Sequence, residues 1–109
     1  APVSSNVCET FAEGLSVRIP HPDALEMILG GVDRVVAVSE DEIAQAMREI
    51  FSATHNVAEG AGASALAALK TEKHLVRDKR VGIVISGGNM DSPRYLKVLA
   101  GETPLMSGR

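Results

Sequence analysis

Residues 81–89 read Val-Gly-Ile-Val-Ile-Ser-Gly-Gly-Asn, an apolar run that passes directly into small and polar residues. An apolar run of this length, rich in β-branched residues, is typical of a strand that is buried on both faces, as in parallel sheets. The residues that follow it would lie at the carboxyl end of the strand, where open α/β sheets bind ligands. We therefore expect the rest of the chain to pack around this stretch.

A second apolar run, residues 34–38, predicts another buried strand, and residues 15–19 predict a short edge strand. The clearest helix begins at Ser39, which forms a capping box with Glu42. Apolar spacing, prolines near helix starts and glycines near helix ends indicate the other helices. The expected helices lie at about residues 22–29, 39–55, 59–76 and 92–100.

This order of elements predicts an α/β fold over residues 1–109, with a partial parallel sheet and flanking helices in a single incomplete unit. Two strands do not make a stable parallel sheet, which usually has about four or more strands. The alanine-rich helix at 59–76 is apolar nearly all round and needs cover on most sides. The sequence therefore predicts either a piece of a larger α/β enzyme or an obligate oligomer.

Composition excludes several classes of protein. The 109 residues carry a net charge of −3 and no basic cluster, so binding to nucleic acid through phosphate neutralisation is not expected. No apolar run is long enough to span a membrane. The single cysteine, Cys8, cannot form an internal disulfide, which suits the cytoplasm. The three histidines lack metal-ligand spacing, so we expect no metal site.

Three short segments hold the candidate binding groups. Residues 86–89 offer a hydroxyl, flexible backbone N–H groups and an amide, although they could also be a plain turn from strand to helix. Glu59 and the glycines after it could face a ligand at a helix start, or could serve close helix packing. Glu13-Gly14 places an acid beside a flexible residue, or forms a simple turn.

Taken together and in order, these segments resemble one known family. The resemblance rests on four stretches: residues 9–14, 32–43, 58–63 and 86–89. They are similar to the C-terminal part of the catalytic domain of threonine/serine dehydratases. These are pyridoxal-phosphate (PLP) enzymes of the tryptophan synthase β-like fold, also called fold type II, and serine racemase is among them. The resemblance implies that this chain is a fragment of that large domain.

The resemblance also implies roles for particular residues. Ser86 would hydrogen-bond the pyridine nitrogen of PLP, and a neutral hydroxyl there suits elimination at Cβ. Glu13 would lie on the substrate side, where the family usually has Asp. The other implied cofactor contacts are Gly87, Gly88 and Asn89 at the pocket edge, Glu59 near the cofactor ring and Gly14 beside cofactor and substrate.

The Schiff-base lysine, the phosphate loop and the cation site of the family lie upstream, so no catalytic residue is expected in this chain. The intact enzyme would be an ammonia-lyase that dehydrates and deaminates threonine- or serine-type hydroxy amino acids to 2-oxo acids. It would be a homo-oligomer, and the isolated chain would be inactive without the N-terminal part. The alternatives are a non-catalytic binding or oligomerisation module, and serine racemase activity in the intact protein.

Overall fold

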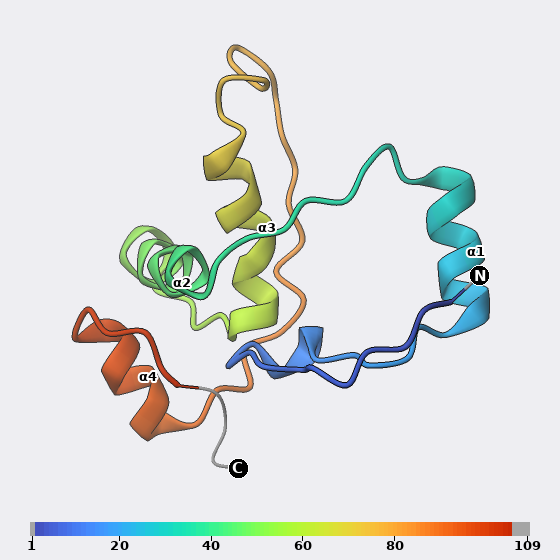
Figure 1. Cartoon of the computed structure of the whole chain (residues 1–109). Coiled ribbons are helices and arrows are strands. Elements are labelled where there is room, and N and C mark those ends of the chain that lie inside the picture. The colour runs from blue at the N-terminus through green and yellow to red at the C-terminus, as the bar shows by residue number, and fades with distance from the viewer. Residues whose placement is uncertain (1, 106–109) are drawn as a thin grey trace.

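The computed structural model describes residues 2–105, and its regular elements in that range are all helical. They are a short 3₁₀ helix, η1 (Glu13–Leu15), and the α-helices α1 (Pro22–Gly31), α2 (Glu40–Thr54), α3 (Gly60–Thr71) and α4 (Ser92–Leu99). Figure 1 shows α2, α3 and α4 side by side, with α1 standing apart. The molecule is flat, with extents of 43 × 41 × 19 Å.

The predicted α/β fold is wrong for the described residues, which contain no strand. Residues 34–38 and 81–85 are irregular, and neither makes a backbone hydrogen bond within residues 2–105. Most of their apolar side chains are exposed, as Val35 (81%) and Val84 (77%) illustrate, while Val38 packs against the core. The physical reason is that a strand exists only beside another strand, and these two segments do not pair with each other.

The predicted edge strand at residues 15–19 is also absent. The chain instead makes the tight turn of η1, in which the Leu15 N–H donates to the Ala12 carbonyl at 2.9 Å. A single backbone bond, from the Ser5 N–H to the Arg18 carbonyl at 2.9 Å, is the nearest approach to strand pairing in this region. One such bond does not make a ladder.

Helix α2 forms as its local sequence predicts. The Ser39 side chain accepts a hydrogen bond from the Glu42 N–H at 3.1 Å, and the Glu42 carboxylate accepts one from the Ser39 N–H at 2.8 Å. This capping box satisfies two backbone donors that a helix start leaves free. The helix ends at His55, whose left-handed backbone (φ 58°) closes the last turn.

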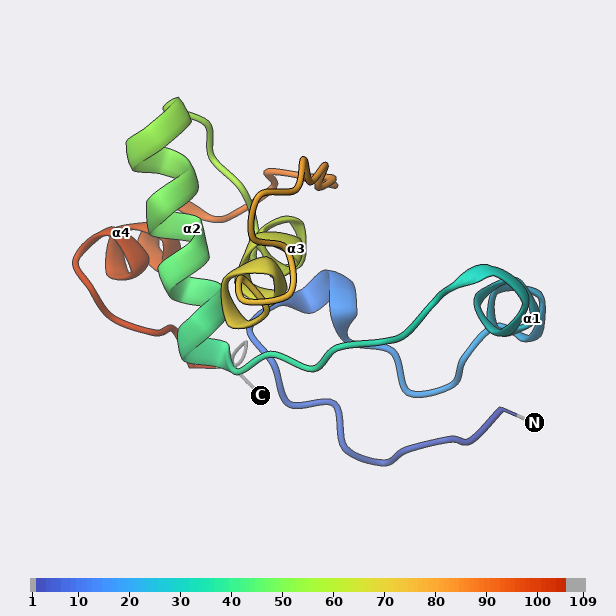
Figure 2. The ribbon, with the colours of Figure 1, turned by 90° about the horizontal axis from the view of Figure 1, so that it is seen from above.

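The core lies between α2 and its neighbours. Ile43, Met47 and Ile50 on α2 are buried. Helix α2 packs against both α3 and α4 (Figures 1 and 2). The other buried apolar residues are small or come from the flanking segments: Phe11, Ala12, Ala44, Ala46, Ala58, Ala63, Ala67 and Val98. The scarcity of large side chains lets the backbones approach closely, and this closeness shapes the candidate site described below.

The remaining helix predictions are right in kind and differ at their ends. Helix α3 stops at Thr71, earlier than the predicted 76, where the chain turns through residues 72–78. Helix α4 begins with Asp91 as its cap, the side chain accepting from the Arg94 N–H at 3.4 Å. Helix α1 contacts no other helix of the described chain and stands apart from them (Figure 2). Met27 and Leu29 on it are each 75% exposed.

Candidate functional site

Two of the predicted site segments meet at the N-terminus of α3. The Glu59 N–H donates to the Gly87 carbonyl at 3.1 Å. A methyl group added at Gly62 would lie 2.5 Å from that same carbonyl oxygen, so only glycine permits this approach. Gly88 is likewise pressed against the Val57 carbonyl. Residues 86–89 are therefore fixed to the start of α3 by their backbone.

The third predicted segment reaches the same place from the N-terminal side. A methyl group at Gly14 would lie 2.7 Å from Ala61 Cβ, and one at Gly60 would lie 2.9 Å from the Cα and Cβ atoms of Ala12. These contacts hold the stretch around η1 against the first turn of α3. Segments whose nearest residues, Gly14 and Ser86, are 86 − 14 = 72 positions apart in sequence thus converge on one helix end.

Glu59 stands at the centre of this convergence. It is the N-cap residue of α3, yet its side chain makes no capping hydrogen bond. Its carboxylate lies instead directly against the α-carbon of Gly87, where a β-carbon would collide with it. Acidic groups are favoured at a helix N-terminus by the helix dipole. The carboxylate therefore faces the 86–89 segment without closing the helix end.

A cavity of about 30 Å³ opens beside Glu59, enough room for a water molecule. Three predicted site residues, Glu13, Glu59 and Asn89, share its wall. The other residues that line it are Phe11, Gly60, Met90, Asp91 and Arg94. Gly14, Ser86, Gly87 and Gly88 lie outside its wall.

Ser86 ends the extended run 81–85 and is exposed. Its hydroxyl makes no hydrogen bond to any residue of the described range 2–105. It directly precedes Gly87, whose carbonyl is bonded to α3, so the backbone on one side of Ser86 is fixed. An exposed hydroxyl on a fixed backbone is able to donate to, or accept from, a bound molecule.

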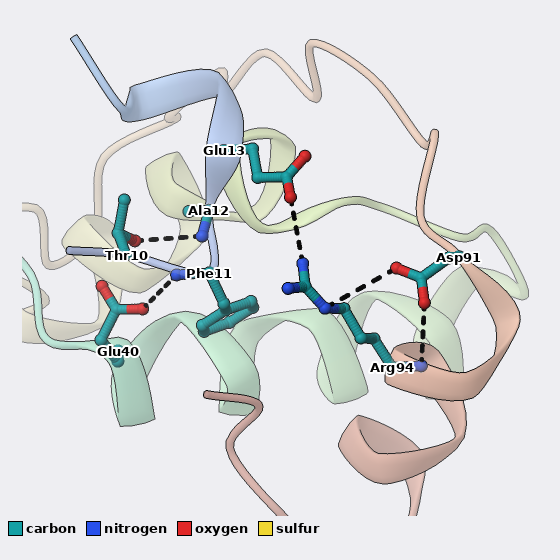
Figure 3. A network of polar contacts seen from close by, with 7 residues as sticks. All are labelled: Thr10, Phe11, Ala12, Glu13, Glu40, Asp91 and Arg94. Carbon is teal, nitrogen blue, oxygen red and sulfur yellow. Dashed lines mark hydrogen bonds and ion pairs between the residues drawn. The ribbon is translucent and has the colours of Figure 1, made fainter. Parts of the chain in front are cut away.

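Arg94 is the residue of this site that the sequence reasoning missed. Its Nη1 lies 3.2 Å from Glu13 Oε1, and its Nε lies 3.8 Å from Asp91 Oδ1, as Figure 3 shows. One signal in the sequence could have found it: a cation in the first turn of α4 opposes the helix dipole. A cation at that position is stabilised by an acidic partner, and Arg94 has two such partners, Glu13 and Asp91.

The backbone on the other side of Glu13 is tied to α2. The Phe11 N–H donates to Glu40 Oε2 at 3.0 Å, and the Ala12 N–H donates to Thr10 Oγ1 at 3.0 Å (Figure 3). Glu40 itself is half-buried. The edge of the site thus depends on side chains from both α2 and α4.

Two open hollows of about 460 and 540 Å³ lie elsewhere, one between α2 and α3 and one between residues 36–38 and α3. Neither is lined by a predicted site residue. Within residues 2–105 no group of three or more histidine, cysteine or acidic residues is arranged to hold a metal ion, and no helix is long and apolar enough to cross a bilayer.

Comparison with known proteins identifies the family of this chain. Residues 1–87 match the family described as "Pyridoxal-phosphate dependent enzyme". The chain belongs to this family. The match covers η1, α1, α2 and α3 and extends to Gly87, so all three converging segments fall within it or at its end. The family identity confirms the resemblance to PLP enzymes that the sequence segments indicate.

Two curated relatives are named as a threonine ammonia-lyase and a threonine dehydratase. The chain is 45% identical over 82 residues to "L-threonine ammonia-lyase" of Thermotoga maritima, covering 75% of this chain and 20% of that protein. It is 34% identical over 96 residues to "L-threonine dehydratase catabolic TdcB" of Staphylococcus aureus USA300, covering 85% of this chain and 28% of that protein. The chain thus spans a fifth to just over a quarter of the length of these curated relatives.

Proposed function

We propose that this chain is the C-terminal portion of the catalytic domain of a longer PLP-dependent ammonia-lyase that acts on L-threonine and related hydroxy amino acids. The observation that carries the proposal is the meeting of residues 14, 59 and 86–89 at the start of α3. These are the residues for which the family resemblance implies cofactor contacts. The names of the relatives support a dehydratase over other PLP chemistries.

The residues present fit one side of the cofactor. Ser86 offers an exposed, uncommitted hydroxyl for the pyridine nitrogen, with Glu59 on the neighbouring segment. The described residues offer no candidate for the lysine that would bind PLP as a Schiff base. Lys70 pairs with Glu49 at 2.5 Å, and no lysine lines the cavity beside Glu59. A reactive lysine needs an apolar pocket or a neighbouring cation. The Schiff-base lysine would therefore come from the remainder of the enzyme.

When bound, PLP supplies the electron sink that makes loss of the α-proton and of the β-hydroxyl feasible. The residues of this chain would bind and orient. Ser86, as a neutral hydroxyl, holds the nitrogen by a hydrogen bond without fixing a positive charge there. Glu13 and Glu59 present carboxylates at the edge of the same cavity, and Asn89 adds an amide.

The remainder of the enzyme would also cover the apolar surface that this chain leaves open. Val35, Val84, Met27 and Leu29 are all more than 70% exposed, which is unusual for so many large apolar side chains in a small monomer. We include a homo-oligomeric state and a cytoplasmic location in the proposal. The free thiol of Cys8 is in keeping with a reducing compartment.

The test uses the full-length protein that contains this chain. We expect an absorbance band at about 400 to 430 nm on addition of PLP, and formation of a 2-oxo acid and ammonia from L-threonine. Ser86→Ala should weaken PLP binding by about two- to tenfold, the factor given by one lost hydrogen bond. Ser52→Ala, on the exposed side of α2, is the matched control and should leave PLP binding unchanged.

Three results would contradict the proposal in whole or in part. A full-length protein that binds PLP and produces only the D-amino acid would be a racemase. A full-length protein that neither binds PLP nor consumes L-threonine would favour a non-catalytic module. A borohydride-stable PLP adduct on a lysine of these 109 residues would overturn the assignment of the Schiff base to the remainder of the enzyme.

A further inference from the structure

Arg94 occupies a position that none of the implied cofactor or substrate contacts explains. It lines the 30 Å³ cavity together with Glu13, Glu59 and Asn89, and it is the one cationic side chain in that wall. Its side chain is only 20% exposed, although it lies in the first turn of a surface helix. A cation that is largely buried at this helix end must be there for the acids it contacts.

The guanidinium of Arg94 is held from its own helix. Asp91 caps α4 by accepting from the Arg94 N–H at 3.4 Å, and its other oxygen lies 3.8 Å from Arg94 Nε. These contacts fix the arginine stem at the start of α4 and leave Nη1 pointing to Glu13 (Figure 3). Arg94 is therefore preorganised before it meets its partner.

Glu13 is in the opposite situation. Its backbone is fixed, because it lies in η1 directly after the anchored residues Phe11 and Ala12. Its side chain is 64% exposed, and the only hydrogen bond or ion pair that it makes within residues 2–105 is the one to Arg94 at 3.2 Å. Arg94 thus selects the orientation of the Glu13 carboxylate from those that a free glutamate would sample.

The length of Glu13 matters for this contact. Aspartate at this position would withdraw the carboxylate by about 1.5 Å, the length of one C–C bond. The distance to Arg94 Nη1 would then exceed the 4.0 Å reach of an ion pair. The contact as it stands therefore depends on the length of the glutamate at position 13.

We propose that Arg94 is a positioning residue that holds the carboxylate of Glu13 at the edge of the cavity shared with Glu59. This inference rests on the proposed function, in which Glu13 lies on the substrate side. Arg94 acts through Glu13 and does not itself contact the reacting atoms. Without Arg94, the Glu13 carboxylate is still present, but its side chain is free to turn into solvent.

The test is a double-mutant cycle in the full-length protein, with Arg94→Gln, Glu13→Gln and both together. Each single variant should raise KM for L-threonine by about fivefold, the strong end of the range for a partly exposed ion pair. The effect falls on KM because a loosened carboxylate weakens contact with substrate in the ground state and the transition state alike. The double variant should be no worse than the worse single variant, and Arg94→Lys should recover part of the loss.

A second arginine provides the matched control. Arg48 on α2 also braces α4, donating from Nη1 to the Val98 and Glu102 carbonyls at 3.0 and 3.3 Å, but it does not contact Glu13. Arg48→Gln should lower the thermal midpoint without changing KM. The same double-mutant cycle should also be measured by thermal unfolding of the PLP-free protein. The decreases in thermal midpoint caused by Arg94→Gln and Glu13→Gln should not add in the double variant.

Several outcomes would overturn the inference. One is that the KM effects of Arg94→Gln and Glu13→Gln multiply, which would make the two residues independent. Another is that Arg94→Gln behaves as Arg48→Gln does and changes the thermal midpoint alone. If either of these results is found and the wild-type protein binds PLP and turns over L-threonine, only the role of Arg94 is refuted. A wild-type protein without PLP binding or turnover refutes the proposed function, and the role of Arg94 with it.

Discussion

Replacing Gly62 with alanine inserts a methyl group between α3 and the 86–89 segment. The new carbon would lie 2.5 Å from the Gly87 oxygen, whereas ordinary contact begins at 3.4 Å. The segment must therefore move by about 0.9 Å, because the obstacle is backbone and cannot rotate away. The same movement stretches the hydrogen bond from the Glu59 N–H to the Gly87 carbonyl, which is 3.1 Å long.

Opposing terms determine the effect of Gly62→Ala on stability. Alanine in a helix interior is favoured over glycine by about 1 kcal/mol. Overpacking costs about 1–3 kcal/mol, and the weakened hydrogen bond costs about 0.5–1.5 kcal/mol. We expect a modest net destabilisation. The larger effect should be on function, since a displacement of about 1 Å near a reacting centre is able to reduce activity about 100-fold.

The assay compares Gly62→Ala with Gly30→Ala in the full-length protein. Gly30 also lies inside a helix, α1, but a methyl group there meets no atom within 4 Å. Gly30→Ala should raise the free energy of unfolding only through the higher helix propensity of alanine, and it should leave PLP binding and turnover unchanged. The reasoning is refuted if Gly62→Ala is as stable as Gly30→Ala and binds PLP as tightly as the wild type.

Three further predictions follow from single contacts. Gly87→Ala should cost little stability, because the obstacle is the flexible Glu59 carboxylate, but it should lower turnover by displacing that acid; unchanged turnover would argue against a role for Glu59. Ser39→Ala should lower the free energy of unfolding by about 1 kcal/mol through loss of the capping box, measured by urea unfolding, with the exposed Ser52→Ala on the same helix as control. Burial raises the pKa of Tyr95, so its ring NMR signal, assigned with Tyr95→Phe, should titrate above the ordinary value of 10.0 in the folded protein. The stability linked to this shift should be present below pH 10 and be lost as the pH rises through the folded pKa. A titration midpoint at or below 10 would contradict this prediction.

Local patterns predicted the helices because the contacts that decide them lie within a few residues. The capping box of Ser39 and Glu42 spans three residues, and the cap of α4 by Asp91 spans three as well. Such signals need no knowledge of the rest of the chain. The predicted end of α3, at residue 76, was wrong because Thr71 is followed by residues that are also compatible with a helix.

The strand predictions failed because a strand depends on a neighbour that no local pattern reveals. Residues 34–38 and 81–85 have the composition of buried strands, and in the structure each lacks a partner for its backbone. Their exposed valines show that apolar character alone does not produce a sheet. The pairing of Arg94 with Glu13 escaped notice for a related reason, since the two residues are 81 positions apart.

The glycines explain how segments that are distant in sequence come together at the candidate site. At Gly14, Gly60 and Gly62 the missing side chain lets one backbone lie against another segment, and each contact joins η1 or residues 86–89 to α3. Helix α3 is in turn packed on α2, which carries most of the large core side chains. The groups at the site edge therefore take their positions from the packing of α3 on α2. Of the two strand-like segments, residues 34–38 contribute Val38 to the edge of that core, whereas residues 81–85 are exposed. The contacts around Glu59 therefore depend on the glycines and on α3, and not on the pairing of strands.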